Sequence, residues 1–171
     1  YLAREIKKFK RAYPSLRYHI TSGDTEQVTE KLEKGLLDFA VLAEKPDSSK
    51  YNFILFPESD TWGLILPAAH PLAKKKAIQM DDLIELPLFC SEQAWNTEIA
   101  EWCKGHIDKL HLEGSFRLSY NGAMFAKEGL GCLLTYRHLI DTSPGSGLVF
   151  RPLKPELKAN MYMIWKKYQI F

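Results

Sequence analysis

Apolar and polar positions in residues 11–43 follow first a period of two, then the spacing of a helix, then a continuous apolar run. Residues 16–20 (LRYHI) alternate apolar and polar side chains, which is typical of a half-buried strand. Asp24 stands where a helix N-cap is expected, and Gly35 stands where that helix would end with a positive φ angle. Residues 37–42 (LDFAVL) are typical of a buried strand. The segment is therefore predicted to form a βαβ unit, with two parallel strands whose carboxyl ends face a ligand-binding crevice.

The rest of the chain continues this alternation of short strands and helices. An apolar stripe at Trp95, Ile99 and Trp102 predicts a helix after Ser91, and a further helix is expected over residues 121–129. The remaining predicted strands cover 51–56, 61–67, 87–90, 116–119, 131–134, 148–153 and 161–165. Strands that alternate with helices along the chain indicate the α/β class.

Composition narrows the range of functions. The 171 residues carry 23 basic and 21 acidic side chains, and this net charge of +2 argues against the segment gripping DNA by itself. The sequence has no apolar run long enough to span a bilayer. Its three cysteines are odd in number and lack CxxC spacing, which fits a reducing cytoplasm.

Catalytic and metal-binding patterns have little support in the sequence. The five histidines show no metal-ligand spacing, and the HExxH and GxSxG motifs do not occur. The run Gly129-Leu130-Gly131 is only GxG, and it follows a predicted helix where a dinucleotide fingerprint follows a strand. Cys90 is interpreted as a small buried residue in preference to a redox-sensing thiol. The chain is therefore predicted not to be an enzyme and to require neither a cofactor nor a metal ion.

Six short motifs, in order over nearly the whole chain, resemble the effector-binding domain of LysR-type transcriptional regulators. None is specific alone, and the signal lies in their order and spacing. They are YP-x-L-x-Y-x-I-x-x-G-x-T with L-x-x-G-x-LDFA, His70-Pro71-Leu72-Ala73, Asp82-Leu83, Pro87-Leu88-Phe89, Glu128-Gly129-Leu130-Gly131 and Gly147-Leu148-Val149-Phe150. The resemblance implies an α/β, two-lobed periplasmic-binding-protein-like (type 2) fold that is truncated at both ends. It also implies a small-molecule effector-binding and oligomerisation domain without enzymatic activity.

Under this resemblance the chain crosses between two subdomains twice. One crossing is expected near residue 66 and the other near residue 147, beside the hinge-like PGSG linker. Regulatory subdomain I is predicted to comprise residues 1–65 plus 147–171, and regulatory subdomain II to be the inserted segment 66–146. Two α/β lobes joined by two connections form a cleft that closes on a small ligand.

Candidate effector-binding residues follow from the resemblance and from three predicted helix N-termini. Backbone N–H groups freed at a helix N-terminus attract polar or anionic atoms. The candidates are Thr21, Ser22, Gly23, Thr25, Ala43, Ser91, Trp95, Asn96, Asn121 and Gly122. Purely structural roles stay open for several residues of these loops, with Asp24 and Asn121 as helix caps and Trp95 as part of the core.

One position departs from the pattern of some aromatic-acid-responsive members of the family. These hold an arginine where this chain has Ala43, and an arginine there would pair bidentately with a carboxylate. Glu44 stands beside it, and the absence of the arginine, together with Asp24 near the expected cleft, argues against an aromatic or dicarboxylic acid effector. The expected effector is a polar or anionic metabolite whose identity the sequence leaves open.

The resemblance also implies partners. A homodimer or homotetramer is expected, with the first helix and residues 16–20 of one chain against the helix at residues 95–102 of another. DNA is expected only through an N-terminal winged helix-turn-helix outside this chain, and the location is expected to be cytoplasmic. Two alternatives stay open: a solute-binding protein of a transporter, and a non-catalytic relative of two-lobed enzymes such as prephenate dehydratase.

Overall fold

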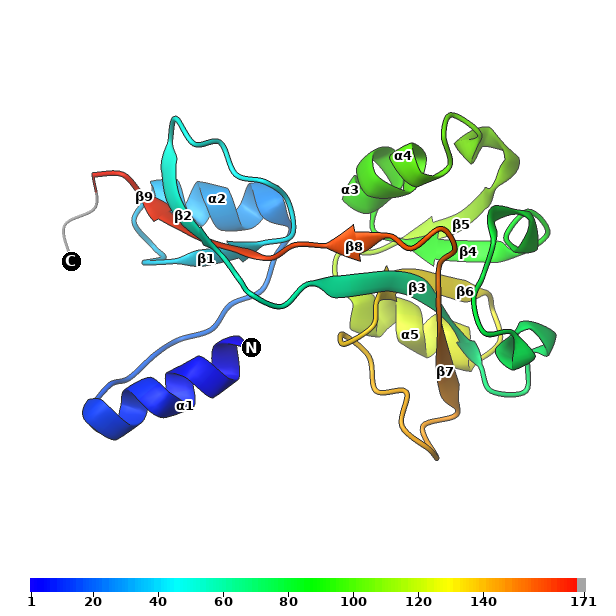
Figure 1. The fold of residues 1–171 in the computed structure, drawn as a ribbon, viewed down its shortest axis with the longest axis horizontal. Helices are drawn as coiled ribbons and strands as arrows, with labels where there is room; N and C mark the ends of the chain where they lie inside the picture. Colours follow the sequence, from blue (N-terminus) through cyan, green and yellow to red (C-terminus); the bar gives the residue numbers. More distant parts are fainter. Residues whose placement is uncertain (169–171) are drawn as a thin grey trace. The chain divides into compact units, whose positions relative to one another are not determined.

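The computed structural model describes residues 1–168, and the chain divides into two compact units (Figure 1). Unit 1 consists of Tyr1–Ser59 and Asn160–Phe171, of which residues 169–171 lie outside the described part. Unit 2 is the continuous segment Asp60–Ala159. Within the described part, none of the helices has the length and apolar character needed to cross a membrane. The chain is thus mixed α/β, with one unit inserted into the other.

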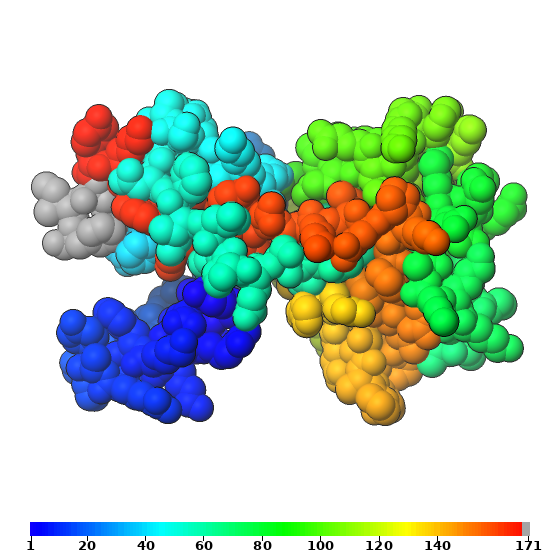
Figure 2. All heavy atoms as spheres, in the orientation of Figure 1, coloured from blue at the N-terminus to red at the C-terminus, as the bar shows by residue number. Residues whose placement is uncertain are grey.

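Unit 1 is a three-stranded antiparallel sheet with one helix packed on it. Its elements are α1 (Leu2–Ala12), α2 (Thr25–Glu33), β1 (Ala40–Leu42), β2 (Tyr51–Leu55) and β9 (Tyr162–Lys166). The strand order is β1-β9-β2, so a strand from late in the chain lies between two early ones. Val28 and Leu32 of α2 share a core with Ala40, Leu42 and Ile164 of the sheet. Helix α1 buries no residue, and Figure 2 shows it in blue beside the rest of unit 1.

The predicted strand at residues 16–20 is wrong. The segment has no regular secondary structure, and Tyr18 and Ile20 are 56% and 66% exposed. A period of two identifies residues that suit a strand, but a strand also needs a neighbour whose N–H and C=O groups pair with its own. β1 pairs antiparallel with β9, so the predicted parallel βαβ unit is not formed by the residues that the structure describes. The predicted helix end is confirmed, since Gly35 has a φ of +70° after α2.

Unit 2 is built around a six-stranded mixed sheet. Its order is β5-β4-β6-β3-β7, with β8 paired to β3. The strands are β3 (Asp60–Pro67), β4 (Pro87–Cys90), β5 (His111–Ser115), β6 (Cys132–Tyr136), β7 (Leu148–Pro152) and β8 (Lys158–Ala159). The helical segments are η1 (Pro71–Lys74), η2 (Met80–Asp82), α3 (Glu92–Ala94), η3 (Trp95–Ile99), α4 (Ala100–Trp102), η4 (Ile107–Lys109) and α5 (Ser119–Lys127). β4 runs parallel to β5 and β6, whereas β3 runs antiparallel to β6, β7 and β8.

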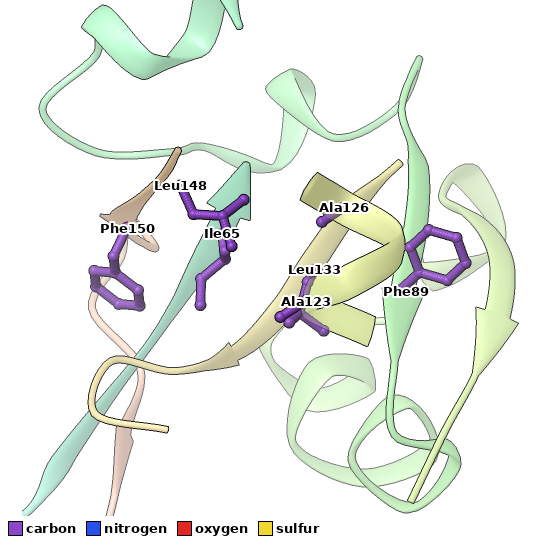
Figure 3. Close-up of a cluster of buried hydrophobic side chains, with 7 residues drawn as sticks. All are labelled: Ile65, Phe89, Ala123, Ala126, Leu133, Leu148 and Phe150. Carbon is purple, nitrogen blue, oxygen red and sulfur yellow. The ribbon is translucent and has the colours of Figure 1, made fainter. Parts of the chain in front are cut away.

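One cluster of the core of unit 2 lies between this sheet and α5 (Figure 3). The cluster is Ile65, Phe89, Ala123, Ala126, Leu133, Leu148 and Phe150. β3 passes close to β7 because residue 63 is a glycine. A Cβ at Gly63 would lie 2.2 Å from Cζ of Phe150 and 2.4 Å from the carbonyl oxygen of Arg151. Only a residue without a side chain fits there.

The structure around α5 tests two predictions from the sequence, a strand before this helix and a glycine at its end. The predicted strand at 116–119 is wrong, because β5 already ends at Ser115 and α5 begins at Ser119. The apolar side chain of Phe116, which suggested a strand, instead packs against the core of the unit. The predicted end of the next helix is confirmed, since Gly129 has a φ of +78°.

Along the sequence, the boundaries between the two units lie between Ser59 and Asp60 and between Ala159 and Asn160. The crossings expected near residues 66 and 147 both lie in unit 2. The reason is that β3 pairs with β6 and with β7, which keeps it with the inserted segment. The assignment of two regulatory subdomains stays a prediction.

Candidate functional site

The first candidate loop leads into the N-terminus of α2 and is held by a side-chain cap. Oδ1 of Asp24 accepts a hydrogen bond from the backbone N–H of Gln27 at 2.8 Å, so the predicted N-cap is confirmed. Gly23 fits closely against the helix, since a Cβ there would lie 2.9 Å from Oε1 of Gln27. The Thr21 hydroxyl accepts a hydrogen bond from Nζ of Lys31 at 3.5 Å. A cationic group therefore stands beside this loop.

The other unit 1 candidates differ in what they offer a ligand. Ser22 is exposed, while Thr25 is half-buried as the first residue of α2. The first backbone N–H groups of an α-helix have no intrahelical acceptor, so the start of α2 presents donors. Ala43 and Glu44 follow β1 and are both half-buried. Ala43 contributes only a methyl group, and the polar chemistry at this end of β1 belongs to the Glu44 carboxylate.

The second group of candidates lies in the helical segment after β4. Oγ of Ser91 caps it by accepting a hydrogen bond from the backbone N–H of Ala94 at 3.3 Å. Trp95 and Asn96 lie in η3, which is a π-helical stretch inside the helix. A π turn inserts extra backbone and shifts the apolar stripe. Ile99 is fully buried, whereas Trp95 is half-buried and Asn96 is exposed.

The third group was expected in a loop, and this expectation is wrong. Asn121 and Gly122 lie inside α5, which begins at Ser119. The N-cap position is Leu118 and makes no side-chain cap bond, so Asn121 does not cap this helix. Asn121 is exposed. Gly122 is buried, and a Cβ there would lie 2.5 Å from Cε1 of Phe116.

One polar pair of unit 2 was not predicted from the sequence. The hydroxyl groups of Ser119, at the start of α5, and Thr135, in β6, are 2.9 Å apart. Thr135 is only 3% exposed, so its hydroxyl is satisfied inside the unit by this contact. The available signal was a threonine within the otherwise apolar run CLLTY. The pair fixes the start of α5 against the end of β6.

Each unit also carries an apolar groove. Groove A, in unit 1, has a volume of 460 Å³ and is lined by Leu2, Ala3, Ile6, Lys7, Lys10, Tyr18 and Ile20. Groove B, in unit 2, has a volume of 560 Å³ and is lined by Phe89, Glu113, Gly114, Ser115, Phe116, Arg117, Asn121, Gly122, Phe125 and Leu130. Two candidate residues, Asn121 and Gly122, therefore line groove B.

Thiol and metal chemistry find no support among the described residues. Burial raises the pKa of the Cys90 thiol to about 12 and that of the Cys132 thiol to about 11, and it also raises the pKa of Cys103. All three are buried, which confirms the interpretation of Cys90 as a buried residue. A protonated thiol is a poor nucleophile. Residues 1–168 hold no group of three or more His, Cys, Asp or Glu side chains placed to bind a metal ion.

The candidate residues thus fall into two groups. Unit 1 carries Thr21, Ser22, Gly23, Thr25 and Ala43, while unit 2 carries Ser91, Trp95, Asn96, Asn121 and Gly122. Within unit 1 the loop before α2 gathers hydroxyls and helix N–H groups. Within unit 2 the candidates divide between the η3 turn and α5. That the two groups act on one ligand stays a prediction.

Almost the whole chain matches one known protein family. Residues 1–169 match the family described as LysR substrate binding domain. The HTH-type transcriptional activator CmpR of Synechocystis sp. is 24% identical over 171 residues, which cover 98% of this chain and 56% of CmpR. The chain therefore spans about half the length of this relative.

Solved structures share the fold. The crystal structure of HinK, a LysR family transcriptional regulator from Pseudomonas aeruginosa, matches with a TM-score of 0.79 and 21% identity, covering 100% of this chain and 60% of HinK. The regulatory domain of Synechocystis PCC6803 CcmR in complex with 2-PG matches with a TM-score of 0.77 and 20% identity, covering 99% of this chain and 83% of that one. The predicted α/β, two-lobed periplasmic-binding-protein-like class is confirmed.

Proposed function

Because the chain belongs to the family of LysR substrate binding domains, we propose that it is the small-molecule effector-binding and oligomerisation domain of a LysR-type transcriptional regulator. The family match over residues 1–169 carries this proposal. CmpR is a transcriptional activator and HinK a transcriptional regulator, which supports a regulator over a transporter's solute-binding protein or a two-lobed enzyme. DNA contact is assigned to a winged helix-turn-helix in the remainder of the protein, and the cytoplasm, where the DNA is, is the expected location.

The proposed effector is a polar or anionic metabolite. The ten candidate effector-binding residues are its proposed contacts. The start of α2 supports this ligand chemistry, because it presents backbone N–H donors and has Lys31 beside Thr21. CcmR, which shares the fold, binds 2-PG. Ala43 supplies no cation, so the charge of an anionic ligand is proposed to be met by helix N–H groups and Lys31.

Signalling is proposed to be a shift between two arrangements of the domain. An effector changes the balance only if it binds one arrangement more tightly than the other. In the whole regulator this shift is proposed to change how DNA-binding modules of neighbouring subunits are spaced. No covalent chemistry is required.

Self-association is proposed to use the apolar surfaces of α1 and α5. Groove A exposes Tyr18 and Ile20, while the α5 side of unit 2 exposes Tyr120 and Phe125. The prediction from the sequence placed the helix at residues 95–102, and not α5, against the first helix of the partner. That helix is a weaker candidate, because Ile99 is buried and the indole of Trp102 is hydrogen-bonded within unit 2. A two-fold dimer with groove A of one protomer against α5 of its partner would bury both surfaces twice.

The test of the proposed function is ligand binding by the purified chain. Polar and anionic metabolites, starting with 2-PG, are screened by thermal shift, and hits are measured by isothermal titration calorimetry. Replacing Thr25 with Val keeps the shape and removes the hydroxyl. A hydrogen bond to a charged ligand contributes about 1.5–3 kcal/mol, so the affinity is expected to fall roughly tenfold or more.

Thr29→Val is the matched control. The Thr29 hydroxyl lies one turn further along α2 and donates to the carbonyls of Thr25 and Glu26 at 2.7 and 3.0 Å. This variant is expected to bind like the wild type. Unchanged affinity in the Thr25→Val variant would remove Thr25 from the site, and no binder in the whole screen would count against an effector role.

A further inference from the structure

The helix that carries Trp95 and Asn96 contains a built-in irregularity. Between α3 and α4 the backbone forms the π-helical stretch η3, and π turns within α-helices often mark functional positions. The Thr97 hydroxyl oxygen lies 2.8 Å from the carbonyl oxygen of Gln93 and also contacts the Glu98 carboxylate. Such back-bonding by threonine competes with regular backbone bonds and favours a local distortion. A change of the η3 turn from π to regular α geometry would alter where Asn96 points.

The far end of the same helix is tied to a distant part of the chain. Nε1 of Trp102 donates to the carbonyl of Pro155 at 2.8 Å. Ile99, at the end of η3, and Cys103, directly after Trp102, are 0% and 1% exposed and anchor this part of the helix in the core. Adding or removing one residue in a helical turn rotates the N-terminal part of the helix by about 100° relative to its C-terminal part. Only the short segment α4 (Ala100–Trp102) separates η3 from Trp102.

Pro155 belongs to the segment through which the chain leaves unit 2. This segment is bound to the start of β3, where the chain enters the unit. The backbone N–H of Leu153 donates to the carbonyl of Trp62 at 3.1 Å, and the N–H of Trp62 donates to the carbonyl of Leu157 at 2.9 Å. β8 then pairs with the first residues of β3. Both crossing segments are thus held in one hydrogen-bonded group.

We propose that Trp102 is a positioning residue that couples the η3 turn to these crossing segments. The proposal deepens the proposed function and rests on it, since it gives the route by which a ligand contact at Asn96 would reach the connections between the units. The elements form a contiguous chain of contacts: Asn96 in η3, the buried Ile99, the Trp102 indole, the Pro155 carbonyl and the Trp62 backbone. Such coupling requires an element with two arrangements, and the proposal assigns this role to the π turn.

The test needs no ligand, because the coupling belongs to the protein itself. Amide hydrogen exchange is followed by NMR at Trp62 and Leu153, whose N–H groups hold the crossing segments together. Trp102→Phe keeps an aromatic ring and removes the donor, and both amides are expected to exchange about three- to tenfold faster, the factor for one net hydrogen bond. Trp165→Phe removes an indole in β9 of unit 1, outside this path, and is expected to leave them unchanged.

Coupling is then measured by a double-mutant cycle. Thr97→Val, which removes the hydroxyl from Gln93, is expected to accelerate both amides in the wild-type background and to add nothing in the Trp102→Phe background. Thr97→Ser keeps the hydroxyl and is expected to restore wild-type exchange. The proposal is overturned if the Thr97→Val effect is absent, if it is equal in both backgrounds, or if amides of β6 accelerate to the same extent. None of these outcomes bears on the calorimetric test with Thr25→Val.

Discussion

The N-cap of α2 offers the sharpest test of how the candidate loop is built. Asp24 accepts a hydrogen bond from the backbone N–H of Gln27 at 2.8 Å and carries its charge at the positive end of the helix. Asp24→Ala removes both contributions. The loss of a cap costs about 1 kcal/mol, within roughly 0.5–2. Asp24→Asn keeps the acceptor and loses only the charge–dipole part, about 0.3–1 kcal/mol.

The measurement must be local, because a chain with two compact units is not bound to unfold in a single step. Amide exchange in the first turn of α2 is expected to accelerate about fivefold in Asp24→Ala and about twofold in Asp24→Asn. Asp38→Ala, which removes a carboxylate elsewhere in unit 1, is the matched control and should leave α2 unchanged.

The two Asp24 variants are also expected to differ in how tightly they bind an anionic ligand. Removing a negative charge beside helix N–H groups is expected to increase the affinity for an anionic metabolite in Asp24→Asn, while Asp24→Ala loses part of this gain through fraying. The reasoning fails if Asn is as damaging to α2 as Ala, since the cap bond would then contribute nothing. It also fails if an anionic effector binds Asp24→Asn more weakly than the wild type.

Three further predictions concern packing and titration. Gly63→Ala places a Cβ 2.2 Å from the Phe150 ring, so amide exchange in β3 and β7 should show a loss of stability of about 1–3 kcal/mol or more. Gly35→Asn, at a position with open space and positive φ, should change the stability that amide exchange reports for α2 by less than about 1 kcal/mol. Leu32→Ala empties a fully buried position and should cost roughly 2–5 kcal/mol, seen as faster amide exchange in α2 and β9 while β6 keeps its protection. Burial raises the pKa of Cys90 from 9.0 to about 12, so the thiol ionises at lower pH in the unfolded chain than in the folded one. The stability that the protonated thiol contributes is therefore fully present below pH 9 and is lost as the pH rises toward 12. Urea midpoints of Cys90→Ala should fall less steeply over this range than those of the wild type, and an identical slope would contradict the assignment.

Local signals in the sequence predicted elements whose causes are local. The Asp24 cap and the glycine ends at Gly35 and Gly129 depend on a few neighbouring residues, and all three are confirmed. The strand at 16–20 failed because its formation depends on a pairing partner, which alternation does not supply. The same holds for residues 116–119, where one aromatic side chain packs under a helix and mimics a strand pattern.

The part of the candidate site that the sequence could not predict is the register of the helix after Ser91. A helical stripe assumes 3.6 residues per turn, so it cannot anticipate the π turn that holds Trp95 and Asn96. The Ser119–Thr135 hydroxyl pair was equally out of reach, because it joins a helix start to a strand end through the tertiary fold. Loop composition was enough to point to residues 21–25 as a capped helix start.

The position of β9 sets an order in which the chain can acquire its structure. β1 and β2 do not pair with each other, because each pairs with β9, and β9 is made more than a hundred residues after them. During synthesis, residues 40–55 therefore leave the ribosome without their sheet partner. Unit 2, which is one continuous segment, can fold before β1 and β2 are paired. Until the last strand arrives, the apolar residues of β1 and β2 remain exposed, and this is the interval in which a nascent chain most needs protection from aggregation.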